Sequence, residues 1–388
     1  MKNFMGYGRA DGSVGIRNYI LVESLVQCAN STVDKIAAAT GAHAIKIDTG
    51  CGEFDDAAQR TNLGLICAGR NPNVYGVLLV SLGCQWTDPK LIQREIELAG
   101  TKVFHLCIQD EGGMANTIRH GTEIIRKMQS EAESLKREEF PLSKLIISLN
   151  SGGSDWTSSI SSNPVCGEAG DRLIADGGSV IGGGTRGMPG DESYTCELAV
   201  NKELGLKILD MVEDYCEDIY ALTGERVQDV NPTPGNKAGG ITTLAEKAMG
   251  NSKMQGTAPL QGLLELGERP PYHGAWFIDE RHGGNDTYLT TAFAMCGANL
   301  MLFTTGRGTP QGNAVMPIIK ITGNPDTDKV FGDEMIDYSC AGILDGSKKI
   351  SECGEELYEL ICAVAEGKET KAEIFGDYSY AAPPASKL

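Results

Sequence analysis

The chain has 388 residues, of which 41% are hydrophobic and 22% charged, an ordinary globular composition with room for about two to three domains. No apolar run approaches the ~20 residues of a membrane helix, and the N-terminal segment lacks the apolar core of a signal peptide. We therefore expect a cytoplasmic protein with no membrane partner. A net charge of −18 without a basic face also argues against nucleic-acid binding.

The chain alternates regularly between predicted strands and helices. Strands are predicted at 19–22, 44–47, 76–81, 102–107, 144–149, 179–181, 275–278, 300–303 and 317–321. Helices are predicted at 31–39, 55–69, 89–98, 116–137, 164–175, 287–294 and 354–365, and one or two helices at 197–220. This rhythm predicts an α/β fold of largely parallel sheets covered by helices, arranged as two Rossmann-like lobes. We place an N-terminal α/β lobe at 1–142, a C-terminal α/β lobe with glycine-rich site loops at 143–377, and an extended tail at 378–388.

The ends of the predicted strands nominate a site, because ligands of open α/β sheets bind beyond the carboxyl ends of the strands. Glycine and small polar residues follow six of these strands, in the segments 48–52, 81–85, 109–113, 150–155, 182–184 and 304–308. Glycine alone is common at such positions. The Ser, Thr, Asn and Gln beside it favour a polyhydroxy or carboxylate ligand.

The segment 231–251, NPTPGNKAGGITTLAEKAMGN, is the stretch around which the chain is organised. It predicts a stiff turn, a glycine-rich loop and a helix start that Thr242 or Thr243 caps, with Glu246 at capping-box spacing from Thr243. Such a loop presents backbone N–H groups to an anion, and Lys237 adds a positive charge. An ordinary loop-to-helix junction is the alternative interpretation, and the P-loop pattern is not matched.

Two arginine-containing segments are further candidates. Arg307 lies among glycines and hydroxyls in 304–313, where it could bind a carboxylate with two hydrogen bonds or hold a neighbouring loop carbonyl. Arg17 lies in a charged segment before the first strand and could either reach the site or belong to a structural ion-pair cluster.

Twelve cysteines occur without a CxxC pair, and we expect no disulfides in a cytosolic protein. Cys51 and Cys84 each follow a glycine at a strand end, so they could be metal ligands or reactive thiols, although cysteine is often simply buried. The segment 279–286 supplies carboxylates and His282 after the strand 275–278. It could bind a divalent metal or do acid–base work, or be a solvated charged loop.

Taken together, these stretches resemble the altronate/galactarate dehydratase family over nearly the whole chain. The most specific are PTPGNKAGG at 232–240 and FTTGRG at 303–308. The other matching segments are 6–21, 48–52, 71–76, 81–84, 108–113, 152–164 and 256–260. The resemblance implies a lyase that dehydrates a sugar acid to a 2-keto-3-deoxy acid by β-elimination, assisted by Fe²⁺ or another divalent metal such as Mn²⁺.

The resemblance and the strand-end pattern together assign candidate roles. Arg307 would bind carboxylate or enolate, His282 or Lys247 would be the base, and Cys51, Cys84 and Asp279 would hold the metal. The expected substrate-binding residues are Arg17, Gln109, Ser154, Asp155, Asn236, Lys237, Thr243, Thr305, Gly306, Gly308 and Asn313.

The chain departs from the family pattern at three places. Ser151 stands where family dehydratases usually have cysteine, and the segment 278–282 replaces a usual MDTPG. The first family motif begins at residue 6, so we expect the small SAF-type domain of single-chain members to be a separate subunit. A homo-oligomer is also expected.

Other functions remain open at this point. The large subunit of a sulfolactate sulfo-lyase is similar in sequence and eliminates sulfite instead of water. A non-catalytic subunit that binds a hydroxy acid is a second alternative. A nucleotide-binding oxidoreductase is disfavoured, because no GxGxxG follows the first strand with an acidic residue ~20 positions later.

Overall fold

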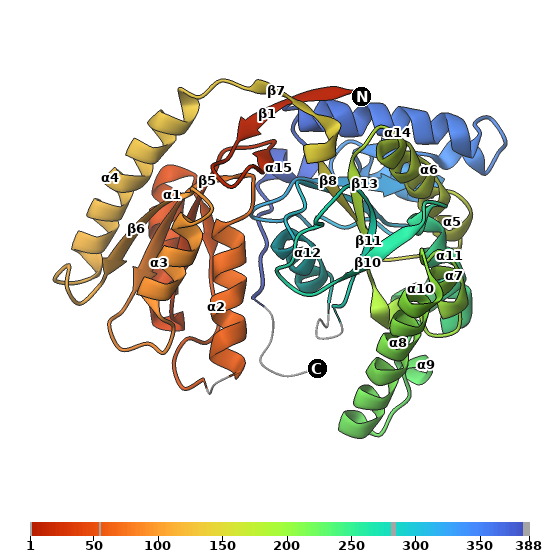
Figure 1. The fold of residues 1–388 in the computed structure, drawn as a ribbon, viewed down its shortest axis with the longest axis horizontal. Helices are drawn as coiled ribbons and strands as arrows, with labels where there is room; N and C mark the ends of the chain where they lie inside the picture. The colour runs from red at the N-terminus through yellow and green to blue at the C-terminus, as the bar shows by residue number, and fades with distance from the viewer. Residues whose placement is uncertain (1, 54–55, 281–284, 383–388) are drawn as a thin grey trace.

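The computed structural model describes residues 2–53, 56–280 and 285–382, and it confirms the predicted α/β class (Figure 1). One lobe surrounds a four-stranded parallel sheet and the other a seven-stranded parallel sheet. In the described part of the chain, no helix has the length and apolar character needed to cross a bilayer. The division into domains at residue 142 stays a prediction.

The four-stranded sheet has the strand order β4-β3-β5-β6. Its strands are β3 (Tyr19–Ser24), β4 (His43–Ile45), β5 (Val74–Ser81) and β6 (Lys102–Cys107). Helices α1 (Asn30–Thr40) and α4 (Met114–Glu133) pack on one face, and α2 (Asp56–Gly69) and α3 (Pro89–Glu97) on the other. The start of α3 shows why these elements form: Asp88 accepts from the N–H groups of Lys90 and Leu91, and Pro89 occupies the first turn.

The seven-stranded sheet has the order β10-β11-β9-β8-β12-β13-β14. Its strands are β8 (Ile146–Ser151), β9 (Ser179–Gly182), β10 (Leu260–Leu264), β11 (Gly274–Ile278), β12 (Leu300–Thr304), β13 (Ile318–Thr322) and β14 (Tyr338–Ser339). The order reverses at β8, since β9 pairs with one of its edges and β12 with the other. This reversal is where an open parallel sheet binds its ligand.

Helices cover both faces of the larger sheet. They are α5 (Trp156–Ile160), α6 (Ser162–Ala175), α7 (Glu192–Glu197), α8 (Lys202–Thr223), α9 (Val227–Val230), α10 (Pro234–Ala238), α11 (Leu244–Ser252), α12 (Asp286–Met295), α13 (Pro325–Phe331), α14 (Ile350–Ala365) and α15 (Lys371–Phe375). Helices α6 and α14 pack together over one face, whereas α12 lies on the face toward the first lobe.

A third, antiparallel sheet was not predicted. It has the order β2-β1-β7, with β1 (Asn3–Gly8), β2 (Val14–Gly15) and β7 (Glu138–Pro141), and it runs across both lobes in Figure 1. These strands are short, and β1 contains two glycines, which weaken the strand signal. The edge strands β10 and β14 were also missed, β10 being interrupted by a register shift.

The two lobes share one apolar core, to which α2 and α12 both contribute. The family-like segment 71–76 reinforces this interface: Asn71 donates to the carbonyls of Ala294 and Ala298, and Asn73 to those of Asn299 and Val315. The described part of the tail, 378–382, bonds to both lobes: the Tyr380 hydroxyl donates to Gly64 O and Ala381 N–H to the Thr291 hydroxyl. The extended tail at 378–388 stays a prediction.

Candidate active site

A cavity of about 740 Å³ opens at the carboxyl edge of the seven-stranded sheet. Its walls come from the loops after β8, β9, β11 and β12 and from helices α8 to α11. Within the described residues, the first sheet contributes nothing to this lining. The strand-end rule therefore located the cavity correctly, but only in the second lobe.

The loops after β8 and β12 are joined by backbone hydrogen bonds at the point of strand reversal. Gly152 N–H donates to Thr304 O at 3.0 Å, and Gly306 N–H donates to Gly153 O at 3.2 Å. Glycine is required twice here. A Cβ on Gly152 would lie 2.6 Å from a carboxylate oxygen of Asp286, and one on Gly306 would lie 2.1 Å from the Asp155 carboxyl.

Glu280 places a buried carboxyl group in the cavity wall just after β11. Its Oε1 accepts hydrogen bonds from the N–H of Gly184 at 3.0 Å and of Thr185 at 2.5 Å, in the loop after β9. Burial raises the pKa of Glu280 to about 7, despite the opposing effect of these N–H groups and of Arg186. A carboxyl group with a pKa near neutrality can both give and take a proton at physiological pH.

Lys247 of α11 reaches the same cavity. Its Nζ donates to Asn231 Oδ1 and to Asn236 Oδ1, each at 3.1 Å. Burial lowers the pKa of Lys247, with Arg186 adding to the effect and Asp286 opposing it. Burial conversely raises the pKa of Asp286, which also lines the cavity.

Two arginines add positive charge to this site. Arg186 follows β9, and its Nε donates to the hydroxyl of Tyr215 at 3.2 Å. Arg307 follows β12 and is exposed in the cavity wall. In a chain with a net charge of −18, three cationic side chains around one cavity suit an anionic ligand.

The cavity brings together five of the sequence-predicted residues, and their functional roles stay predictions. They are Ser154, Asn236, Lys247, Arg307 and Gly308. Thr305 and Gly306 lie directly behind the lining. The Thr305 hydroxyl accepts from the N–H groups of Arg307 and Gly308, so it shapes the turn that presents Arg307.

Asp155 is occupied by structural hydrogen bonds. Its carboxylate caps α5 through Ser158 N–H, and it also accepts from the hydroxyls of Thr157 and Ser158 and from the Asn324 amide. It is buried and does not line the cavity. The geometry therefore assigns Asp155 to holding the loop and not to contacting substrate.

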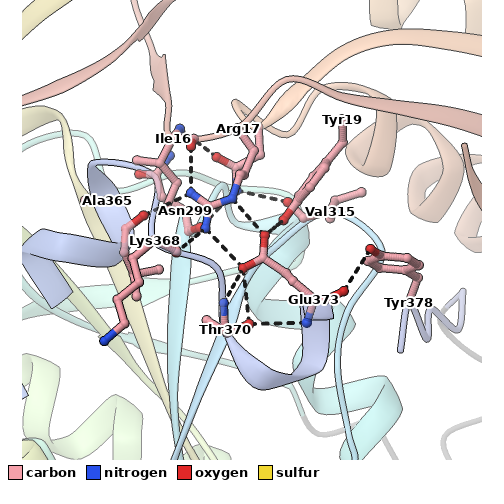
Figure 2. A network of polar contacts seen from close by, with 12 residues as sticks. Ile16, Arg17, Tyr19, Asn299, Val315, Ala365, Lys368, Thr370, Glu373 and Tyr378 are labelled. Atoms are coloured by element: carbon pink, nitrogen blue, oxygen red, sulfur yellow. Dashed lines mark hydrogen bonds and ion pairs between the residues drawn. The ribbon is translucent and has the colours of Figure 1, made fainter. Parts of the chain in front are cut away.

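Arg17 is a structural residue too, as Figure 2 shows. It forms a two-point ion pair with Glu373, with N–O distances of 2.7 and 3.0 Å, and donates to the carbonyls of Ile16, Val364 and Lys368. These bonds use all five guanidinium N–H groups, so none remains for a ligand. Of the two interpretations of Arg17, the structure supports the structural cluster.

Four other predicted substrate-binding residues lie outside the cavity lining. Lys237 and Gln109 are exposed, Thr243 caps α11, and Asn313 accepts from Val315 N–H. The predicted Thr243–Glu246 start of α11 is confirmed. The expected glycine-rich loop before it is wrong in part. Residues 234–238 form the short helix α10, because Thr233 and Asn236 cap it reciprocally.

The predicted metal ligands are not gathered around this cavity. Cys51 and Cys84 are exposed on loops of the first lobe, and Asp279 lies outside the lining. His282, which was predicted as a base, falls outside the described residues. In the described ranges, no group of three or more His, Cys, Asp or Glu side chains is placed to hold a metal ion. The described residues therefore do not fit a bound ion, and the Fe²⁺ or Mn²⁺ stays a prediction.

Sequence reasoning missed Glu280, Asp286 and Arg186 as individual site residues. The first two belong to the segment 279–286, and Arg186 follows the glycines after β9, so the strand-end pattern contained a signal for each.

Ser151 lines the cavity and donates to Asn251 Oδ1 at 2.9 Å. The departure from the family pattern at that position thus lies in the candidate site itself.

Comparison with known proteins agrees with the resemblance seen in the sequence. The family model for D-galactarate/altronate dehydratase, C-terminal, matches residues 142–384, and the model for the second domain of D-galactarate dehydratase/altronate hydrolase matches 6–133. The chain belongs to the D-galactarate/altronate dehydratase family. It is therefore a member of a family of lyases.

The individual relatives are named either as dehydratases or as a subunit of a sulfo-lyase. An altronate dehydratase of Bacillus subtilis is 32% identical over 84% of this chain and 66% of its own length, slightly less than two thirds. An altronate dehydratase of Escherichia coli is 30% identical over 94% of the chain and 74% of its own length. The (2R)-sulfolactate sulfo-lyase subunit beta of Chromohalobacter salexigens is 31% identical over 97% of the chain and 95% of its own length.

Proposed function

We propose that this protein is the large subunit of a lyase that dehydrates a sugar acid, or a related small hydroxy acid, to a 2-keto-3-deoxy acid. The observation that carries this proposal is the shared cavity of Glu280, Lys247 and Arg307. It combines a carboxyl group with a pKa of about 7, an amine with a lowered pKa and an exposed guanidinium. Family membership supplies the reaction class.

The reaction is a β-elimination. A base removes the proton from the carbon next to the substrate carboxylate, the electron pair forms a carbon–carbon double bond, and the β-hydroxyl leaves as water after protonation. The resulting enol tautomerises to the 2-keto acid. Lys247 in its neutral form is our candidate base, and the lowered pKa makes that form accessible. His282, the other candidate base, remains a sequence-based expectation.

Glu280 in its protonated form is the candidate acid for the leaving hydroxyl. Arg307 and Arg186 would hold the carboxylate and stabilise the negative charge that develops on it as the proton leaves. Asn231 and Asn236 orient the Lys247 amine through their side-chain oxygens. No step is assigned to a metal, because the described residues do not form a metal site.

The predicted metal has a direct test. Elemental analysis of anaerobically purified protein, compared with Cys51→Ser and Cys84→Ser variants, measures whether iron or manganese is bound near one ion per chain. Stoichiometric metal that the two variants lose would support the predicted ligands. Metal that both variants retain, or no metal in any preparation, would remove those two residues from the metal set.

Sulfo-lyase activity is the second candidate, and one observation favours it. The sulfo-lyase subunit beta matches over 95% of its own length, whereas the two altronate dehydratases match over 66% and 74% of theirs. That relative is named as a subunit, so we also propose a separate small SAF-type partner for this chain.

The deciding experiment measures 2-keto acid release from altronate, galactarate and sulfolactate, with and without the co-expressed partner. Sulfite release separates the sulfo-lyase from the dehydratase. Turnover that Lys247→Met and Glu280→Gln both abolish would support the proposed site. Binding of these acids without turnover, even with partner and added Fe²⁺ or Mn²⁺, would favour a non-catalytic binding subunit.

A further inference from the structure

A second cavity, of about 810 Å³, lies between the two lobes and has no lining residue in common with the candidate active site. The first lobe contributes residues of α1 and β4, and the second contributes β13, α15 and the tail. Most of the wall is apolar or aromatic: Ala37, Ala42, Ala44, Pro310, Met335, Ala372, Phe375, Tyr378 and Tyr380. Its charged residues are three lysines, Lys46, Lys320 and Lys371, and two carboxylates, Glu334 and Asp377.

Lys320 is the unusual member of this wall. It lies within β13 and is only 1% exposed. Its Nζ donates to Pro310 O at 3.1 Å, and within the described residues no carboxylate lies within ion-pair distance of it. An ammonium group has three N–H donors, so two remain for another partner.

Asp337 and Asp377 act favourably on this charge, but neither forms an ion pair with Lys320, and burial lowers the pKa of Lys320 in spite of them. Both carboxylate oxygens of Asp337 accept backbone N–H groups, Oδ2 from Lys320 and Oδ1 from Lys371. Asp377 accepts through Oδ1 from the N–H and the hydroxyl of Ser379, and Glu334 is exposed to solvent. The two carboxylates therefore offset the cost of burying the ammonium only in part, and an anion in the adjacent cavity would offset more of it.

We propose that the interlobe cavity is a second binding site, in which Lys320 binds a small carboxylate or phosphate anion whose body packs against the apolar wall. Lys371 and Lys46 lie in the same wall and extend the positive charge toward the opening. Lys371 Nζ donates to Asp333 O, and Lys46 pairs with Asp34 at 3.0 Å, so Lys320 is the principal anion contact.

The position of this site between the lobes connects it with the candidate active site. The loop after β12 places Arg307 and Gly308 in the wall of the first cavity and Pro310, the acceptor of the Lys320 hydrogen bond, in the wall of the second. The first turn of α12 likewise contributes Asp286 to one cavity and Thr287 to the other. An anion at Lys320 thus binds next to the segments that form the active site, without entering it.

Binding of sodium phosphate and of sodium pyruvate, a simple 2-keto acid, tests the proposal at constant ionic strength set with chloride. We compare the wild-type chain with Lys320→Met, Lys320→Arg and Arg307→Met by titration calorimetry and thermal unfolding. At an anion concentration tenfold above its Kd, we expect the wild type and Arg307→Met to gain about 1–3 °C in Tm. Lys320→Met should lose that gain and bind at least tenfold more weakly, while Lys320→Arg should bind.

Each outcome decides between the possibilities. Preference for pyruvate would assign the site to a carboxylate metabolite, and preference for phosphate to a phosphate or phosphorylated ligand. An equal Tm shift in Lys320→Met and the wild type, or no binding of either anion to the wild type, would overturn the proposal. Loss of the shift in Arg307→Met but not in Lys320→Met would place the anion in the other cavity and overturn the proposal too.

If Lys320→Met does not fold, Lys371→Met tests the same wall and should weaken binding. None of these readouts requires turnover, so they remain informative if the proposed lyase activity fails.

Discussion

Replacing Glu280 with glutamine gives the sharpest test of the candidate site. Glutamine retains an oxygen for the N–H groups of Gly184 and Thr185 but cannot ionise. The folded protein raises the pKa of Glu280 from its ordinary 4.5 to about 7, so it holds the proton more tightly than the unfolded chain does. The stability from this group is therefore fully present below pH 4.5 and is lost as the pH rises through about 7.

The magnitude follows from the two pKa values. At 1.36 kcal/mol per pH unit, the rise from 4.5 to about 7 corresponds to about 3 kcal/mol. The free energy of unfolding of Glu280→Gln, relative to the wild type, should therefore increase by roughly that amount between pH 4.5 and 8. The variant should also lose at least about 100-fold in kcat, the usual contribution of a general acid.

Urea denaturation at pH 5, 6, 7 and 8 measures the first effect, and 2-keto acid release measures the second. Glu225→Gln is the matched control, because this carboxylate lines the same cavity but is exposed. A stability difference between Glu280→Gln and the wild type that stays constant from pH 5 to 8 would refute the reasoning. It would mean that the fold does not hold Glu280 protonated.

Three further variants test the other assignments. Lys247→Met should lower kcat for 2-keto acid release at least about 100-fold through loss of the base. Lys237→Met should stay within about twofold of the wild type, since Lys237 is exposed and outside the cavity. A larger loss in Lys237→Met than in Lys247→Met would support Lys237 as the anion-binding residue. Arg17→Met should lower the free energy of unfolding in urea by about 3–5 kcal/mol, because it leaves Glu373 buried without its partner. Adding Glu373→Gln to the same chain should recover part of that loss, and an unchanged denaturation midpoint in Arg17→Met would contradict this reasoning. Asp155→Ala should lower the free energy of unfolding by about 2 kcal/mol or more through the lost helix cap and the lost Asn324 bond, whereas a change in KM at unaltered stability would support substrate contact instead.

Much of the fold could be predicted because it depends on local patterns. The strands at 19–24, 74–81, 102–107 and 300–304 are apolar runs between turn signals, and the parallel arrangement follows from their alternation with helices. The antiparallel sheet could not be predicted in this way. Strand β1 pairs with β7 across more than 130 residues, and neither strand has the length or composition by which a strand is predicted from sequence.

The same distinction between local and long-range information applies to the residues of the candidate site. Arg307 and Gly308 could be found because glycine, hydroxyl and arginine follow one another at a strand end. Arg17 has the same local appearance, a charged residue near glycines before a strand, yet its partner Glu373 lies 356 residues away in sequence. Local sequence cannot distinguish an arginine that meets a ligand from one that meets a carboxylate brought near by folding.

Glu280 shows why residue chemistry is harder to predict than residue position. The strand-end rule places a carboxylate at this edge of the sheet, but whether it titrates near pH 4.5 or near 7 depends on burial and on N–H groups up to 96 residues away in sequence. The same argument applies to Lys320, whose sequence context is that of an ordinary parallel strand. Its importance arises because β13 places the ammonium beside a cavity, where burial outweighs the favourable charges of Asp337 and Asp377. In both cases the fold buries an ionisable side chain, and this burial changes its affinity for a proton or a counter-ion. The local sequence does not specify that burial.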